Sequence, residues 1–188
     1  KRKWYVKYER ALKKAMPLLN YHNNWKNVLF SDYGIMSIQK GYKLNKTIKS
    51  GKYLDYMKEN DKEYVMIESN LEYLKKFVDL AREYNTKLII VGFPSQNSWN
   101  YQRDKKFNEL SKELGFTFIN LNKYDLDINW ETDTKDEGGH LNYYGALKTS
   151  KVLGNILKET NLLIDHRGDK NYKLWDTAYL RYKEEVEK

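Results

Sequence analysis

The stretch KLIIVGF at residues 87–93 is a continuous apolar run with the length of one β-strand, and FTFINL at residues 116–121 is a second. Uninterrupted apolar runs are typical of strands covered on both faces, as in a parallel sheet. Between them, residues 103–114 are predicted as a helix that ends at Gly115. With further helices on either side, this order of elements predicts an α/β fold with a mainly parallel sheet.

The flanking helices are predicted at residues 70–84 and 142–158, where apolar side chains recur three and four residues apart. Ser69 and Glu72 have the spacing of a capping box, and Asn142 is a good N-cap. The predicted buried or closely packed positions are Leu71, Leu74, Phe77, Val78, Ala81 and Tyr84 in the first helix, and Gly145, Ala146, Leu153, Gly154 and Ile156 or Leu157 in the second. A basic amphipathic helix is predicted at residues 4–15, whereas residues 18–61 show little periodicity.

Polar residues follow the first predicted strand, where an α/β sheet collects its ligands. Ser95, Gln96, Asn97 and Trp99 are therefore candidate pocket residues, although such clusters also occur in plain surface turns. Trp99 and Trp130 offer rings that stack on a sugar, or simply pack in the core.

His140 stands in DEGGHLN, residues 136–142, between an acidic, glycine-rich loop and the start of a helix. A neutral imidazole acts as a general base when a carboxylate holds one ring nitrogen in the right tautomer. Asp136 or Glu137 can supply that carboxylate. The alternative is that His140 only packs under the loop. His22, among apolar and aromatic neighbours, is predicted as a structural histidine near the core.

Length and composition indicate one domain over residues 1–188, with 40% hydrophobic residues and no apolar run of the roughly 18 residues that span a membrane. Cysteine is absent, and the three histidines have no metal-ligand spacing, so neither a metal nor another cofactor is predicted. The chain has a net charge of +8, and its excess of positive charge lies in residues 1–60, which carry 14 Lys and Arg against 4 Asp and Glu. No nucleic-acid reader motif accompanies this charge, so nucleic acid is not a predicted partner.

The block DEGGHLNYYGALK, residues 136–148, resembles the last block of SGNH/GDSL-type hydrolases. The similar branch reads D-x-x-H-L-N-x-x-G-A-x-K and comprises envelope-associated proteins of Gram-positive bacteria, related to teichoic-acid D-alanylation proteins and alginate O-acetyltransferases. Further similar stretches occur in family order at residues 21–25, 70–84, 88–95 and 164–169, followed by Trp175. The resemblance implies a three-layer, flavodoxin-like SGNH fold that lacks its N-terminal strand.

Two departures from that family affect the predicted site. The family aspartate lies three residues before the histidine, where this chain has Glu137, and Asp136 lies four before. Asp136 is slightly favoured, and Glu137 is near enough to serve equally. The family serine belongs to a G-D-S-like block, and neither that block nor G-x-S-x-G occurs here, while Ser95 lacks the glycine context. The resemblance thus implies a C-terminal portion, with the serine and a membrane anchor encoded upstream.

The predicted function is part of an extracytoplasmic, membrane-associated ester hydrolase or acyl transferase acting on a cell-envelope polymer with acetyl or D-alanyl groups. His140 with Asp136 or Glu137 would supply the base and its carboxylate, and Ser95, Asn97 and Trp99 would contact substrate. The alternative is a non-catalytic module on the same scaffold that binds anionic glycopolymer such as teichoic acid. An open edge at the missing strand also predicts a possible homodimer.

Overall fold

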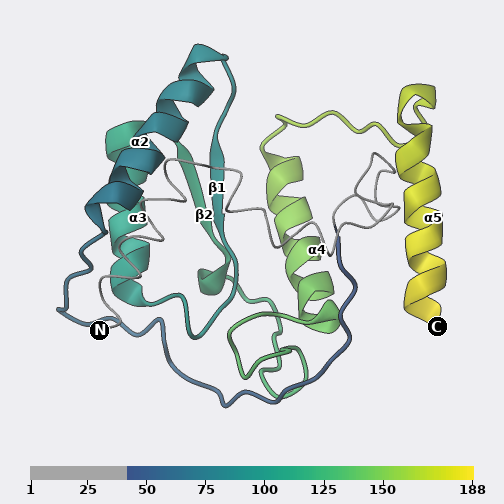
Figure 1. Cartoon of the computed structure of the whole chain (residues 1–188), viewed down its shortest axis with the longest axis horizontal. Helices are drawn as coiled ribbons and strands as arrows, with labels where there is room; N and C mark the ends of the chain where they lie inside the picture. Colours follow the sequence, from purple (N-terminus) through teal and green to yellow (C-terminus); the bar gives the residue numbers. More distant parts are fainter. Residues whose placement is uncertain (1–41) are drawn as a thin grey trace, which may run out of the picture. The chain divides into compact units, whose positions relative to one another are not determined.

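The computed structural model describes residues 42–188, which form four α-helices, two short 3₁₀ helices and a two-stranded parallel sheet (Figure 1). One compact unit spans Leu44–Asp165. It contains α2 (Glu68–Glu83), β1 (Ile89–Gly92), α3 (Tyr101–Leu114), β2 (Thr117–Asn120), η4 (Leu121–Lys123) and α4 (Tyr143–Glu159). The described chain is mixed α/β with parallel strands, as predicted. The predicted helix at residues 4–15 and His22 lie outside the described residues.

The two strands pair in parallel, with Ile90 opposite Phe118 and Val91 opposite Ile119. Successive side chains point to opposite faces of a strand, so each face meets different helices. Ile90 and Phe118 pack against a cluster built on Val78 of α2 and Leu110 of α3. On the other face, apolar side chains of both strands and α4 share a cluster: Ile89, Val91, Ile119, Leu121, Leu126, Val152, Leu153, Ile156 and Leu157. Figure 1 shows the sheet between α2 and α3 on one side and α4 on the other.

Two of the three helix ends predicted from local sequence signals are confirmed. Gly115 ends α3 in the left-handed conformation at φ 75°, and its N–H bonds the carbonyl of Ser111. Asn142 caps α4 as predicted. The capping box is wrong, because α2 already begins after Ile67, which has no side-chain cap bond. Ser69 consequently lies inside the helix rather than before it.

Three predicted packing positions are also wrong. Phe77 on α2 and Tyr84 just after it are 57% and 70% exposed, because the sheet covers only a narrow strip of this helix around Val78. A Cβ on Gly154 of α4 would have nothing within 4 Å, so this glycine does not serve close packing. Gly145 is closely packed, but against the backbone of Asp133 rather than against the sheet.

Residues 44–67 contain neither helix nor strand, yet much of this segment is fixed by backbone hydrogen bonds to the loop before α4. Lys49 N–H donates to the carbonyl of Thr134 (2.9 Å), and Gly51 N–H to that of Trp130 (2.8 Å). The N–H of Tyr143, the first residue of α4, donates to the carbonyl of Asn45 (2.7 Å). Hydrophobic periodicity has no way to report such pairing, which explains why this region has no readable pattern.

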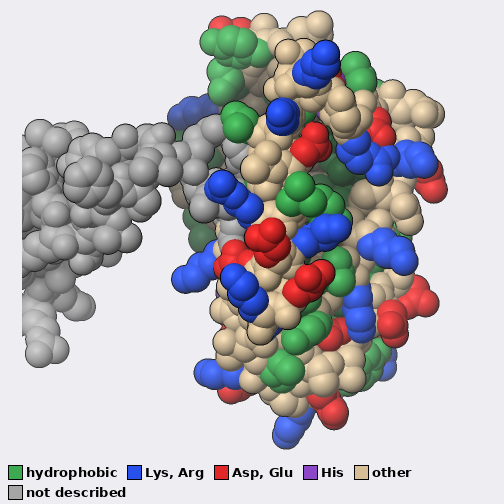
Figure 2. Space-filling model, turned by 90° about the vertical axis from the view of Figure 1, so that its right-hand side faces the viewer, with side chains coloured by type: hydrophobic (Ala, Val, Ile, Leu, Met, Phe, Trp, Pro, Cys, Tyr) green, Lys and Arg blue, Asp and Glu red, His purple; other side chains and the backbone are tan. Residues whose placement is uncertain are grey.

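The second unit includes His166–Lys188, with η5 (Lys170–Tyr172) and α5 (Lys173–Glu187). The ring of His166 stacks on that of Tyr172 with centroids 4.0 Å apart. On the molecular face in Figure 2, acidic and basic side chains are interspersed with hydrophobic ones, so that face presents no patch of a single charge. The single-domain prediction for residues 1–188 stays a prediction, because residues 1–41 are not described.

Candidate active site

The loops after β1 and β2 meet at one edge of the sheet, because parallel strands end on the same side. Asn122, just after β2, ties them together. Its Nδ2 donates to the carbonyl of Phe93 (3.1 Å), and its Oδ1 accepts from the N–H of Ser95 (3.1 Å). The glycine-rich loop reaches the same edge, where the N–H of Gln96 donates to the carbonyl of Gly138 (2.9 Å). Three loops thus converge at the carboxyl ends of the strands.

His140 and Asp136 form a pair within this glycine-rich loop. The ring Nδ1 of His140 contacts Oδ2 of Asp136, and the backbone N–H of His140 donates to Oδ1 of the same carboxylate (2.5 Å). The imidazole is 72% exposed, and its Nε2 has no hydrogen-bond partner among residues 42–188. A carboxylate on Nδ1 with Nε2 open is the arrangement that a general base requires.

The charge on Asp136 is favoured by its surroundings. Partial burial acts to raise its pKa, but hydrogen bonds from the ring and backbone N–H of His140, together with the charge of Lys135, hold the pKa of Asp136 below its usual value. The carboxylate is therefore ionised at neutral pH. An ionised partner favours the Nδ1–H tautomer, which leaves Nε2 as the proton acceptor.

Thr134 is fully buried and fixes the shape of the glycine-rich loop that carries His140. Its hydroxyl donates to the carbonyl of Lys49 (3.1 Å) and accepts from the N–H of Gly138 (2.8 Å). Gly138 has φ 97°, a conformation that side chains rarely adopt. Gly51 is equally constrained, because a Cβ there would lie 2.9 Å from the carbonyl carbon of Glu137. Residues far apart in sequence therefore set the backbone that presents His140.

Asn142 joins the end of this loop to α4. Its Oδ1 accepts from the N–H groups of Tyr144 (3.0 Å) and Gly145 (3.3 Å), which caps the helix. Its Nδ2 donates to the carbonyls of Thr47 (3.2 Å) and Thr132 (2.7 Å). Only 1% of Asn142 is exposed, so its amide is a structural clamp whose hydrogen-bonding groups are all used.

Asp133 and Lys148 anchor α4 to the loop in the same way. Lys148 Nζ lies 2.9 Å from Oδ2 of Asp133, and the Asp133 side chain is 4% exposed. Burial acts to raise the pKa of Asp133, but hydrogen bonds from Lys148, the N–H of Asn129 and the hydroxyl of Thr132 outweigh it and lower that pKa. The asparagine, glycine and lysine of the H-L-N-x-x-G-A-x-K pattern thus have structural roles here.

The two candidate carboxylates differ in position. Glu137 has φ 63°, in the left-handed region, and its side chain is exposed. Within residues 42–188 its carboxylate makes no hydrogen bond or ion pair, whereas Asp136 contacts the ring of His140. The structure therefore brings Asp136, and not Glu137, to the imidazole.

A cavity of about 390 Å³ lies beside His140 and is also lined by Ser95, Ser98, Trp99, Thr149 and Ser150. Ser95 is 7% exposed, and its hydroxyl donates to the carbonyl of Gly139 (2.7 Å) and accepts from the N–H of Ser98 (3.2 Å). Both roles of this hydroxyl are structural. Ser95 shapes the cavity wall rather than offering a free nucleophile.

Trp99 and Asn97 occupy different parts of this region. The indole of Trp99 lines the cavity and stacks on Phe118, with centroids 5.9 Å apart. A Cβ on Gly92 would lie 2.6 Å from this indole, so the end of β1 must be glycine. Asn97 is exposed, and its Nδ2 would lie 3.1 Å from a Cβ on Gly139, on the same side as Asp136 Oδ1. Asn97 thus approaches the His140 loop without lining the cavity.

Sequence reasoning did not single out Asn122 or Thr149. It named Gln96 as a candidate pocket residue, but Gln96 is not among the residues that line the cavity beside His140. Asn122 could have been found by the rule that flagged Ser95, since it directly follows a strand. Thr149 is 1% exposed and lines the cavity, and its Oγ1 has no hydrogen-bond partner among the described residues. Both side-chain amide atoms of the buried Gln96 also have no hydrogen-bond partner among the described residues. No local sequence signal marks a buried hydroxyl or amide as unpaired.

No family model, curated protein or solved structure matches the chain. The assignment to SGNH/GDSL-type hydrolases therefore stays a prediction. Among residues 42–188, no three His, Cys, Asp or Glu side chains are grouped so as to hold a metal ion. In the same part of the chain, no helix combines the length and the apolar character needed to cross a membrane.

Proposed function

We propose that this chain supplies the histidine base and its carboxylate to an SGNH-like, three-layer α/β ester hydrolase or acyl transferase. The observation that carries the proposal is the Asp136–His140 pair, set beside a 390 Å³ cavity at the carboxyl edge of a parallel sheet. The substrate would be an acylated cell-envelope polymer, in an extracytoplasmic, membrane-associated protein. Helices on both faces of the described strands are consistent with that fold.

In the proposed reaction, Nε2 of His140 takes a proton from a serine hydroxyl as its oxygen attacks the ester carbonyl. Asp136 holds the Nδ1–H tautomer and stabilises the imidazolium that forms. The imidazolium then returns the proton to the leaving alcohol, and water or an acceptor hydroxyl resolves the acyl-serine by the same route. Backbone N–H groups of the loops around the cavity would stabilise the oxyanion.

The attacking serine in this proposal lies upstream of the 188-residue chain, because the G-D-S-like block that carries it in the SGNH/GDSL family does not occur in residues 1–188. Ser95 is committed to Gly139 and Ser98 through its hydroxyl. Ser98 and Ser150 also line the cavity, but no hydrogen bond joins either hydroxyl to His140 within the described residues. We therefore expect the 188-residue chain alone to hydrolyse esters at close to the background rate.

The test compares the 188-residue chain with a polypeptide extended at its N-terminus by its natural preceding sequence, using p-nitrophenyl acetate. In the extended polypeptide, His140→Ala should lower kcat/KM by about 10⁴- to 10⁶-fold, and Asp136→Asn by about 10²- to 10⁴-fold. Glu137→Gln is the matched control, because this neighbouring carboxylate does not contact the ring, and its kcat/KM should stay within about twofold of the unmodified protein.

Three outcomes would overturn parts of this proposal. Enzyme-like turnover by the 188-residue chain that His140→Ala abolishes would place the nucleophile within it, and Ser95→Ala, Ser98→Ala and Ser150→Ala would locate it. An active extended polypeptide insensitive to His140→Ala would remove the histidine from the mechanism. Inactivity of both polypeptides, with saturable binding to teichoic acid, would favour the glycopolymer-binding module.

A further inference from the structure

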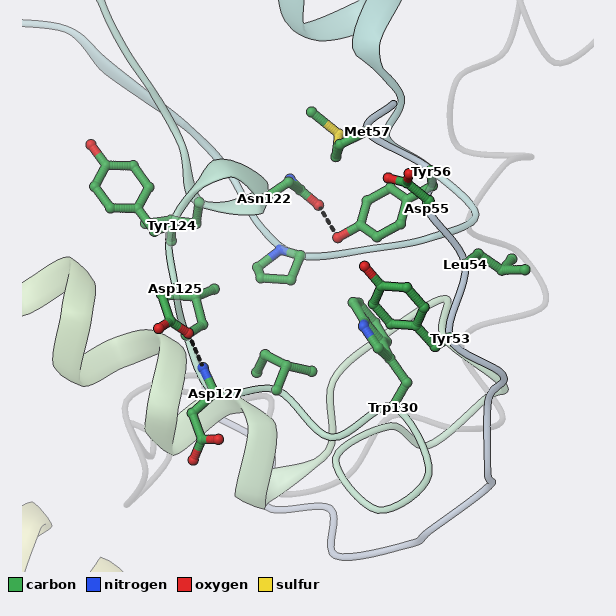
Figure 3. A pocket seen from close by; sticks show the side chains of 14 residues that line it. Tyr53, Leu54, Asp55, Tyr56, Met57, Asn122, Tyr124, Asp125, Asp127 and Trp130 are labelled. Carbon is green, nitrogen blue, oxygen red and sulfur yellow. Dashed lines mark hydrogen bonds between the residues drawn. The ribbon is translucent and has the colours of Figure 1, made fainter. Parts of the chain in front are cut away.

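A second cavity, of about 350 Å³, lies at the same edge of the sheet and shares Pro94 with the cavity beside His140. We call it the aspartate–aromatic cavity, after four rings and three carboxylates in its lining: Tyr53, Tyr56, Tyr124, Trp130, Asp55, Asp125 and Asp127. Figure 3 shows Tyr53, Tyr56 and Trp130 on one wall, and Tyr124, Asp125 and Asp127 on the opposite wall. No step of the proposed reaction uses this cavity.

The charge of the aspartate–aromatic cavity is opposite to that of the chain. The chain has 34 Lys and Arg against 26 Asp and Glu, yet no basic residue is among the described residues of the lining. Lys123 stands between two lining residues but pairs with Asp104 of α3 (3.3 Å). Of the three lining carboxylates, Lys148 pairs only with that of Asp127, at 3.6 Å. Asp55 and Asp125 thus have no ion pair among residues 42–188, and the cavity disfavours phosphate and other anions.

Two rings of the aromatic wall, those of Tyr56 and Trp130, are held in place. The hydroxyl of Tyr56 donates to Oδ1 of Asn122 (3.0 Å), and the ring of Tyr56 meets that of Trp130 edge to face, with centroids 5.8 Å apart. Burial raises the pKa of Tyr56 to about 12, so its phenol stays uncharged at physiological pH. Trp130 is only 8% exposed. Tyr56 and Trp130 are therefore preformed apolar surface, and Tyr53, which is 78% exposed, adds a more accessible ring to the same wall.

Ring faces and carboxylates attract one kind of ligand together. A cation is drawn to the π-face of an aromatic ring and to an unpaired carboxylate, and the two attractions add. An anion is repelled by the carboxylates, and a neutral polyol gains hydrogen bonds but no net charge attraction. We propose that the aspartate–aromatic cavity binds an organic cation, a primary or quaternary ammonium group on a small molecule or on the end of a longer one.

This site is independent of the proposed reaction, although the two cavities adjoin. Asn122 accepts from Tyr56 in one cavity wall and from the N–H of Ser95 in the other. The test is an NMR titration of the 188-residue chain with choline and with n-butylammonium. The control ligand is 3,3-dimethylbutan-1-ol, which has the shape of choline without its charge. The indole N–H resonance of Trp130, assigned through Trp130→Phe, reports occupancy.

We expect saturable shifts of this resonance with both cations, and none with the neutral alcohol at the same concentrations. Asp55→Asn and Asp125→Asn should each weaken cation binding about three- to tenfold. Glu131→Gln, an exposed carboxylate next to Trp130 but outside the lining, should leave it unchanged. Unchanged Tm values for the three variants would exclude unfolding as the cause.

Four results would overturn the proposal. They are equal shifts with the neutral alcohol, unaltered affinity in both aspartate variants, a response to neutral monosaccharides but not to cations, and no saturable response to either cation. The first would indicate apolar contact alone, and the third a carbohydrate site on the same rings. None of these results bears on the ester assay, so this proposal and the proposed function fail separately.

Discussion

Gly145 and Gly154 lie on the same helix, α4, and substitution of each by alanine should change stability in opposite directions. A Cβ on Gly145 would lie 2.5 Å from the carbonyl oxygen of Asp133 and 3.0 Å from Cδ2 of Leu141. A Cβ on Gly154 would have nothing within 4 Å. The pair therefore separates the effect of packing from the general preference of helices for alanine.

The magnitude for Gly145→Ala follows from these distances. Non-bonded carbon and oxygen atoms need about 3.4 Å or more, so residue 133 and the first turn of α4 must move apart by about 1 Å. The atom in the way is backbone, and it also accepts the N–H of Asn142 (3.0 Å), so this bond is strained as well. Overpacking of this kind costs about 1–3 kcal/mol. The helix propensity of alanine offsets up to about 1 kcal/mol of that cost.

Urea unfolding followed by circular dichroism at 222 nm measures both variants. Gly145→Ala should lower the free energy of unfolding by about 1–2 kcal/mol, and Gly154→Ala should raise it by about 0.5–1 kcal/mol. In both variants the free energy of unfolding should depend on urea concentration with the same slope as in the unsubstituted protein, since neither substitution changes the surface exposed on unfolding. A Gly145→Ala protein as stable as the original would show that the loop carrying Asp133 yields without cost, and would refute the reasoning.

Variants at three further positions test other contacts of the site. Asn142→Ala should lower the free energy of unfolding by about 2–4 kcal/mol in the same urea assay, because it removes the helix cap and the hydrogen bonds that Nδ2 donates. Asn142→Asp keeps the capping oxygen but sets a buried carboxylate oxygen against the carbonyls of Thr47 and Thr132, so it should cost at least as much. Asp133→Asn should cost about 1–2 kcal/mol at pH 7, since Lys148 is one-third exposed. Because the folded pKa of Asp133 is lowered, the charged carboxylate stabilises the fold above the unfolded pKa near 3.9, and this is lost as pH falls through the folded value. The urea midpoints of the two proteins should therefore converge below about pH 4, and a constant gap would contradict this. Gln96→Met should leave stability unchanged or raise it by up to about 1 kcal/mol, because both amide atoms are buried and without a partner in the described chain, and a clear loss by thermal unfolding would reveal a bond to its amide.

Local sequence signals predicted the elements whose ends and faces depend on local chemistry. The apolar runs gave both strands, which are shorter than expected at Ile89–Gly92 and Thr117–Asn120, and Gly115 and Asn142 gave helix ends. Phe77 was misassigned because its helical spacing is that of a buried stripe. Only tertiary packing decides that Val78 is buried while its neighbour Phe77 is exposed. Ser69 was misassigned because the helix already begins after Ile67, which provides no side-chain cap.

The candidate site was predictable only where it is local. Asp136 and His140 are four residues apart, so a short loop brings them together, and the choice against Glu137 needed the left-handed backbone at that residue. The support from Lys49 to Thr134 was not predictable, because it joins residues 85 apart through a backbone carbonyl. Backbone groups are the same in every residue type and leave no trace in the sequence.

That distant support also predicts an order in which parts of the protein fold. Bonds between residues 45–51 and residues 130–143 close a loop of more than half of the described chain, and closing a loop of this length costs entropy before any contact repays it. The helices and the two neighbouring strands can assemble from nearer contacts. We therefore expect the loop with His140 to gain protection from amide hydrogen exchange late in refolding, after the sheet has formed.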